Sequence, residues 1–230
     1  MNRSPVLTGL VLATLGGGIA QAQPAAPPLV ASPPADTAGY FVPKQAGTIM
    51  VRLRAIGVIP ETMSSSVSVI GGGVNVTATP APEVDLSYFF TDHLAAELIA
   101  ASTRHEVSAG HTSLGHLDVG SVYVLPPTLT LQYHFMPASR FSPYVGAGLT
   151  VAFFYDSQPA GPTVTKVGLS TGVGPTIQAG FDYSIGGPWF ANFDVKQVFL
   201  NTQARINDGT IVAKTALNPT IIGAGIGYRF

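Results

Sequence analysis

The sequence contains no cysteine and few charged residues. Only 10% of its 230 residues are Asp, Glu, Lys or Arg, against roughly 25% in an ordinary soluble domain. The absence of cysteine excludes a disulfide framework and a thiolate metal site. The formal net charge of -1 argues against nucleic acid as a partner, because phosphate binding requires a basic surface. The chain is nevertheless 46% hydrophobic, and this apolar content needs an explanation.

Long apolar runs are also lacking after residue 43, which excludes a transmembrane helix of ~20 residues there. An apolar run at 6–20 follows Arg3 and ends at Ala20-Gln21-Ala22, the small-x-small pattern of a signal-peptidase site. We therefore expect residues 1–22 to be a signal peptide; a short membrane anchor is the alternative. Residues 23–46 are rich in Pro and Ala and are expected to form a periplasmic arm without a core.

In the rest of the chain, polar and apolar residues alternate with a period of two, which is the pattern of strands with two different faces. From 128 to 135, Thr, Thr, Gln and His alternate with Leu, Leu, Tyr and Phe. The pattern recurs and predicts eight strands, at about 47–59, 82–91, 93–103, 122–136, 142–155, 171–184, 188–200 and 217–230. Long loops are expected at 60–81, 104–121, 156–170 and 201–216, and short turns between the other strands. An even strand number with long loops on one rim is typical of a bacterial outer-membrane barrel.

A soluble sandwich or lipocalin-like barrel would show the same alternation with its faces reversed. Three features favour a barrel whose apolar outer face contacts lipid: too little charge for a solvated surface, the secretory signal, and aromatic residues near the strand ends. These aromatic residues are Tyr88, Phe90, Tyr133, Phe135, Phe153, Phe154, Tyr183, Trp189, Tyr228 and Phe230. The predicted fold is therefore all-β: an eight-stranded antiparallel transmembrane β-barrel over residues 47–230. It would contact outer-membrane lipid, with both termini on the periplasmic side.

The polar faces predict what lies inside. Eight strands enclose an interior just wide enough to be filled by side chains, and buried charges need partners. The expected lumen network is Arg52, Arg54, Glu83, Asp85, Glu97, His134, Asp182, Asp194, Lys196 and Arg229. A salt-bridged plug is the first interpretation, and an ion path is the alternative.

The last strand ends on an aromatic residue. Gly225, Tyr228 and Phe230 match the spacing of the C-terminal signal by which the barrel assembly machinery recognises outer-membrane proteins. Gly223 departs from that signal, which usually has a polar residue at its place. The terminal strand is expected to pair with the first, because a closed barrel has no edge.

Several stretches together resemble the OmpW family of small outer-membrane proteins. They are VRLRA at 51–55, HLAAELIAASTRHEV at 93–107, VLPPTLTLQYHF at 124–135, SPYVGAGLTVAFFYD at 142–156 and GYRF at 227–230. The resemblance covers most of the chain from about residue 47. It implies an eight-stranded barrel with a narrow, largely hydrophobic channel that lets small hydrophobic molecules cross the outer membrane. No gate residue of the family can be aligned with the variable loops.

An apolar loop suits such a solute. Residues 61–82 carry almost no charge, and their apolar members, expected at the channel mouth, are Met63, Val67, Val69, Ile70, Val74 and Val76. Exposed apolar surface usually marks a binding site or a buried face. An extension of the flanking strands above the membrane is an equally good and compatible interpretation of this segment.

The function expected is a passive channel for small hydrophobic molecules. Because a polar plug blocks straight passage, lateral exit into the bilayer is a hypothesis that accompanies it. The alternative is a structural or surface-binding barrel that displays its loops without transport. Neither cofactor nor metal is expected, since His105, His111 and His116 match no familiar ligand spacing. No enzymatic activity is expected either, because His111 and Ser113 lie in a predicted loop that would not orient them.

Overall fold

The computed structural model describes residues 40–61, 64–113, 115–162 and 164–230 of the chain. The predicted signal peptide and most of the predicted arm lie outside these residues. The described part is built almost entirely of β-strands, with a single 3-10 turn, η1 (Asn207–Gly209). It contains no helix with the length and apolarity needed to cross a membrane.

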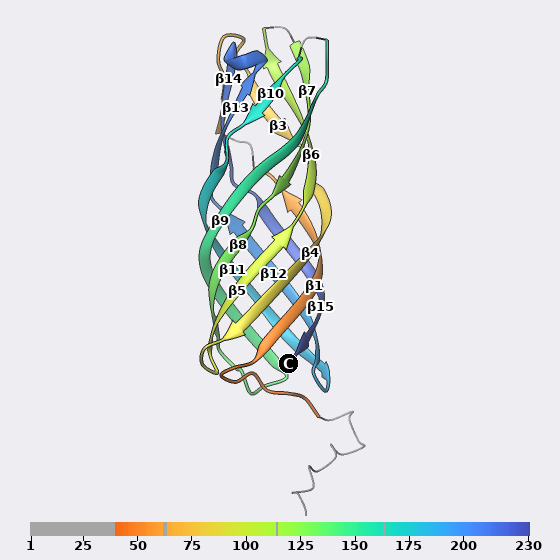
Figure 1. Ribbon diagram of the computed structural model, residues 1–230, viewed down its shortest axis with the longest axis vertical. Coiled ribbons are helices and arrows are strands. Elements are labelled where there is room, and N and C mark those ends of the chain that lie inside the picture. Colours follow the sequence, from red (N-terminus) through yellow and green to blue (C-terminus); the bar gives the residue numbers. More distant parts are fainter. Residues whose placement is uncertain (1–39, 62–63, 114, 163) are drawn as a thin grey trace, which may run out of the picture. The chain divides into compact units, whose positions relative to one another are not determined.

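Eight antiparallel strands form a closed barrel (Figure 1). In spatial order they are β1 (Ile49–Ile59), β4 (Thr79–Phe89), β5 (Leu94–Ala101), β8 (Thr128–His134), β9 (Phe141–Pro159), β11 (Gly172–Gly186), β12 (Trp189–Val198) and β15 (Thr220–Arg229). The last strand pairs with the first over ten residue pairs, from Met50↔Arg229 to Ile59↔Thr220. The predicted eight-stranded antiparallel barrel is thus confirmed, and so is its closure by the C-terminal strand.

The alternation is that of a membrane barrel, with polar side chains inside. Leu53 is 56% exposed and Leu129 is 59% exposed, whereas their neighbours Arg52, Arg54 and Thr130 are almost completely buried. Each of the aromatic residues predicted near the strand ends has an outward-facing or partly exposed side chain. Phe154 is an exception in direction, because it packs inward against the buried cluster of Ile56, Val58 and Leu200.

All four segments predicted as loops contain strand, so the loop prediction was wrong for them; at 60–81 the structure shows the other interpretation, an extension of strand structure beyond the barrel strands. The hairpins are β6 (Thr103–Thr112) with β7 (Gly115–Leu125), and β13 (Leu200–Ile206) with β14 (Ile211–Leu217). Shorter strands are β2 (Ser64–Val67), β3 (Gly73–Val76) and β10 (Val167–Leu169). Together they prolong the barrel beyond the end opposite the C-terminus (Figure 1). Small and polar residues on their outer faces hide the alternation, because these faces meet water instead of lipid. We call this part the long-hairpin end and the opposite one the short-turn end.

The wall between β5 and β8 is interrupted next to two consecutive prolines; a shorter interruption lies beside Pro219, between the pairs Gln197↔Thr220 and Leu200↔Leu217. β5 and β8 pair up to Ile99↔Thr128, and β6 and β7 resume pairing at Thr103↔Val124. Between these pairs lie Pro126 and Pro127, which have no N–H to donate. The neighbouring ladder to β9 is kept, since the N–H of Val151 donates to the carbonyl of Pro127. We refer to the gap between residues 100–102 and 125–127 as the proline seam.

Candidate functional site

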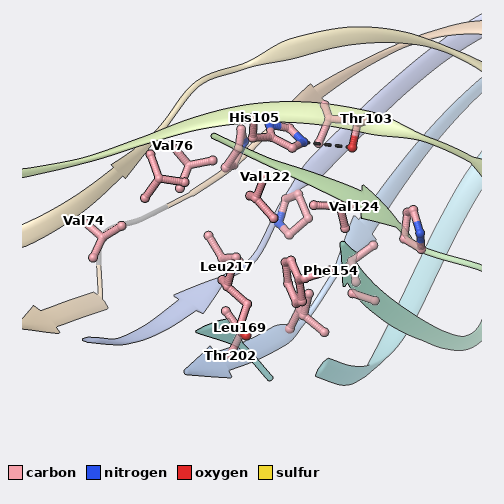
Figure 2. Close-up of a pocket in the computed structure, with 18 of the residues that line it drawn as sticks. Val74, Val76, Thr103, His105, Val122, Val124, Phe154, Leu169, Thr202 and Leu217 are labelled. Atoms are coloured by element: carbon pink, nitrogen blue, oxygen red, sulfur yellow. Dashed lines mark hydrogen bonds between the residues drawn. The ribbon is translucent and has the colours of Figure 1, made fainter. Parts of the chain in front are cut away.

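An apolar cavity occupies the lumen at the long-hairpin end. Its volume is about 120 Å³, and nearly all of its lining is aliphatic. Both the barrel strands and the hairpins contribute to the lining. The lining residues include Ile56, Val58, Val122, Phe154, Val198, Leu200 and Leu217. Figure 2 shows Val122 and Val124 of β7, Phe154 of β9 and Leu217 of β14 around this space. The proline seam borders the same cavity, because Ala101 and Pro126 both line it.

His105 is a polar group in the upper wall of the cavity. One ring nitrogen, Nε2, lies 3.0 Å from the hydroxyl of Thr103, and the other, Nδ1, lies 2.8 Å from the carbonyl of Thr77. Its neighbours Arg104 and Glu106 point outward and form an exposed ion pair, so His105 lies beyond the lipid-facing belt. Burial lowers the pKa of His105, and the hydrogen bond to Thr77 opposes this shift only in part. The imidazole is therefore neutral at pH 7, which keeps the upper cavity uncharged.

The predicted channel-mouth residues divide into two groups. Val67, Ile70, Val74 and Val76 line the cavity. Val69 does not: its positive φ of 72° places it in a tight turn, and its side chain is 84% exposed. The prediction for Val69 is thus corrected, because an alternation rule does not hold across a turn. Met63 lies outside the described residues.

Below the cavity, two arginines of β1 organise a buried ion-pair cluster. Arg52 contacts Asp85 at 2.7 Å and Glu97 at 2.9 Å. Arg54 contacts Asp85 at 2.7 Å and Glu83 at 2.8 Å. The cluster comprises Arg52, Arg54, Glu83, Asp85, Glu97, Asp182, Asp194, Lys196 and Lys44, all of them buried. Buried charges of this kind are stabilised by pairing with one another. The ion pairs join β1 to β4, β5, β11 and β12 across the lumen.

Lys44 is the member of this cluster that sequence reasoning missed. It comes from the segment 40–46, the described end of the predicted arm, which we call the strap. Its ammonium lies 2.7 Å from the carboxylate of Asp182 and donates to Nδ1 of His134 and Oγ of Ser142, each at 2.7 Å. The only signal for it in the sequence was a lone lysine in an otherwise uncharged stretch from 37 to 51.

The strap crosses the short-turn end of the barrel. Its backbone pairs with Gly187 on one turn, and the N–H of Lys44 donates to the carbonyl of Pro137 on another. The N–H of Ala46 donates to the carboxylate of Asp92 on the third. A fully buried apolar cluster lies next to it and contains Met50, Phe89, Ala95 and Phe190. Together they fill the short-turn end beneath the ion pairs.

Arg229 and His134 both face the lumen at this end, as predicted from the alternation. Arg229 donates to the carbonyl of Val42 and to Ser184, and its guanidinium lies 4.7 Å from the centre of the Phe190 ring. It forms no ion pair with a described residue, so it stands apart from the ion-pair cluster. His134 donates from Nε2 to Oε1 of Gln132 at 3.0 Å and packs against Phe89 and Tyr144.

The three residues of the predicted assembly signal lie in β15 and at its end. Tyr228 and Phe230 form an aromatic group with Trp189 on the outer surface, with ring centres 4.7–5.0 Å apart. Gly225 stands opposite Arg54 on one side and Asn192 on the other. A side chain there would collide with the backbone of Leu53, since an added Cβ would lie 2.0 Å from its carbonyl oxygen.

The loop histidines do not converge. His105 lines the cavity, whereas His116 is exposed and lies 3.1 Å from Asp118. His111 is exposed in the β6–β7 hairpin. Within the described ranges no group of three or more His, Asp and Glu side chains is arranged to hold a metal ion.

With this geometry in hand, comparison with known proteins gives the family. Residues 45–230 match the sequence profile of the OmpW family. The chain belongs to the OmpW family. The match covers the whole barrel together with the last residues of the strap, and it makes the chain an integral barrel of the outer membrane.

Individual relatives agree with this assignment. The outer-membrane protein y4mB of Sinorhizobium fredii is 38% identical over 203 residues, which cover 86% of this chain and 87% of the relative. Outer membrane protein W of Vibrio cholerae is 34% identical over 196 residues, covering 81% and 90%. The crystal structure of the outer membrane protein OprG from Pseudomonas aeruginosa superposes with a TM-score of 0.76 at 26% identity, covering 82% of this chain and 98% of OprG.

Proposed function

We propose that this OmpW-family barrel is a passive channel that takes small hydrophobic molecules from outside the cell into the outer membrane. The observation that carries the proposal is the apolar cavity of about 120 Å³ at the long-hairpin end. For comparison, an engineered apolar cavity of roughly 150 Å³ stays dry and binds benzene. Since a desolvated aliphatic lining offers nothing to an ion or a sugar, the solute it favours is a small apolar one.

The exit we propose is lateral. Straight passage toward the short-turn end meets fully buried ion pairs and then the cluster around Met50 and Phe190. The proline seam adjoins the cavity, and the backbone there lacks ladder pairs that a moving solute would have to break. The outer side of the seam carries one polar contact, between Ser102 and Tyr155 at 2.6 Å.

This route presumes an orientation in the membrane. We place the short-turn end, the strap and both termini on the periplasmic side, and the long hairpins outside the cell. Residues 1–22 would act as the signal peptide that brings the chain there. Gly225, Tyr228 and Phe230 would be recognised by the barrel assembly machinery during insertion.

A surface-binding barrel without transport is the second candidate, and one observation favours it. A groove of about 500 Å³ lies at the long-hairpin end and is lined by polar and apolar groups together. Asn75, Arg104, Glu106, Asp118 and Gln158 contribute to it. Its charged and amide side chains suit a polar or amphipathic surface ligand better than a purely hydrophobic solute.

Uptake of radiolabelled toluene separates the two candidates. Initial rates would be compared in cells lacking the protein and in cells re-expressing it at matched levels. The informative variant is Val67→Ser with Val74→Ser, because both side chains are buried against the cavity. Val69→Ser is the matched control on the same segment, since its side chain points into solvent.

We expect the double variant to lower uptake toward that of cells without the protein, while Val69→Ser transports like the wild type. Uptake that is indifferent to the protein would refute the channel and leave the surface-binding barrel. Equal loss in all variants would indicate damage to the hairpins and not to the cavity.

A further inference from the structure

An ion pair at the floor of the apolar cavity has hydrogen-bonding capacity that its described neighbours do not take up. Glu83 and Lys196 both line the cavity, and their side chains are 3% and 2% exposed. Lys196 lies 3.1 Å from Oε1 of Glu83 and 2.7 Å from Oδ1 of Asp194. Arg54 reaches the same oxygen of Glu83, at 2.8 Å.

These contacts leave one acceptor and one donor. Both cations meet Oε1 of Glu83, and none of the described residues donates to its Oε2. An ammonium has three N–H donors; among the described residues Glu83 accepts a hydrogen bond from Lys196, and Asp194 adds an ion-pair contact at 2.7 Å, so at least one N–H is left. Buried polar groups in native proteins are nearly always paired. A free carboxylate oxygen beside a free ammonium N–H, at the bottom of an otherwise apolar space, therefore indicates a place for a polar group of a ligand.

We propose that Glu83 and Lys196 form a polar seat for the hydroxyl group of a small apolar alcohol or phenol. The hydroxyl would donate its hydrogen to Oε2 of Glu83 and accept a hydrogen bond from Nζ of Lys196. The hydrocarbon part would fill the aliphatic space above. This inference rests on the proposed channel function and narrows its solute class.

The chemistry of the seat discriminates among related solutes. A hydrocarbon of equal size fills the space but leaves both polar atoms unpaired. An ether accepts from Lys196 but has no hydrogen for Glu83. A carboxylate meets the negative charge of Glu83 in a desolvated site, where like charges repel strongly. A hydroxyl group alone satisfies both atoms without adding charge, and the cavity volume of about 120 Å³ limits the solute to a single small ring with a short substituent.

The test uses the full barrel in lipid nanodiscs and the methyl resonances of Val198 and Leu200, which line the cavity. Saturable shifts would be measured with cyclohexanol, methylcyclohexane, methoxycyclohexane and cyclohexanecarboxylate. In a purely apolar cavity the hydroxyl would be buried unpaired, so the alcohol would bind more weakly than the hydrocarbon. With the seat, cyclohexanol binds at least as tightly as methylcyclohexane, and the carboxylate binds weakest.

A variant adds a second readout. In Glu83→Gln, the ratio of the cyclohexanol and methylcyclohexane affinities is expected to fall at least tenfold. Glu61→Gln is the matched control, because Glu61 is exposed and lines neither the cavity nor the outer groove, and there the ratio stays unchanged. If Glu83→Gln does not fold, the order of the four ligands on the wild-type barrel still decides.

Two results would overturn the proposal. Tighter binding of methylcyclohexane, with a ratio that Glu83→Gln does not change, would refute the seat and leave the hydrophobic channel intact. Absence of saturable shifts with every compound would refute the seat and the channel together.

Discussion

The ammonium of Lys44 lies 2.7 Å from the carboxylate of Asp182, and both side chains are fully buried. The contact joins the strap to the inner face of β11 and balances the charge of the lumen. The barrel strands bury five carboxylates, Glu83, Asp85, Glu97, Asp182 and Asp194. They bury four cations, Arg52, Arg54, Lys196 and Arg229, and Lys44 is the fifth.

Replacing Lys44 by methionine should therefore release the strap and loosen the short-turn end. The neutral side chain leaves Asp182 with Arg52 at 3.5 Å as its remaining ion-pair partner. Removing one partner of a buried pair costs up to about 3–5 kcal/mol, and here water entering at the short-turn end would relieve part of that cost. We expect a lower midpoint in urea unfolding from lipid vesicles and faster backbone hydrogen exchange at the strap.

Gln45→Met is the control for Lys44→Met, since Gln45 is the exposed neighbour. The same measurements should not change in this variant. An undisturbed strap in Lys44→Met would mean that the backbone contacts to Gly187 and Pro137 hold it without the ion pair.

The eight barrel strands of this fold could be predicted from sequence, whereas of the long-hairpin end only the extension at 60–81 was among the interpretations. Strands such as 128–134 face lipid and a charged lumen, so the polarity contrast between their faces is large. On the hairpin strands the polarity is reversed, with apolar side chains toward the cavity, and small residues such as Ala109 and Gly110 on β6 make the contrast between the two faces weak. Alternation placed Arg52 and Arg54 in the lumen. It gave no information on Lys44, because the strap is not a strand, or on Val69, because a turn redirects its side chain.

The proline seam predicts an effect of cross-linking. Ala101 and Pro126 lie opposite each other in the register set by Ile99↔Thr128 and Thr103↔Val124. Because the chain has no cysteine of its own, Ala101→Cys with Pro126→Cys introduces a single disulfide across the seam. Oxidation should reduce transfer of an apolar dye from outside into the bilayer of proteoliposomes, and reduction should restore it.

The matched disulfide lies on another wall of the barrel. Ala55→Cys with Ala224→Cys would join directly opposed residues of β1 and β15. Transfer should not depend on its redox state. Equal transfer by the oxidised and reduced forms of the seam variant would exclude an exit there.

Acidification should weaken the cavity through His105. Burial lowers the pKa of this side chain from its ordinary value of 6.5, so the folded hairpins favour the neutral imidazole. The unfolded chain then binds more protons than the folded one below about pH 6.5, and the hairpins lose stability as the pH falls through that range. Binding of an apolar probe and hydrogen-exchange protection of β6 should decrease together between pH 7 and pH 4.5.

His105→Asn removes this titration and should flatten the pH profile of both measurements. His116→Asn, at an exposed position beside Asp118, should keep the wild-type profile. A profile unchanged by His105→Asn would assign the acid sensitivity to other groups.

A substitution at Gly225 can distinguish a role in barrel packing from a role in recognition by the assembly machinery. An added Cβ would lie 2.0 Å from the carbonyl oxygen of Leu53 and 2.7 Å from Cα of Arg54, and overpacking of this kind typically costs about 1–3 kcal/mol. Gly225→Ala should therefore lower barrel stability when the denatured chain refolds into detergent micelles, where no machinery is present. Gly57→Ala, at a position with open space around the added carbon, should refold like the wild type. If Gly225→Ala refolds normally in micelles but fails to insert in cells, the glycine serves recognition, because the barrel itself then tolerates the methyl group.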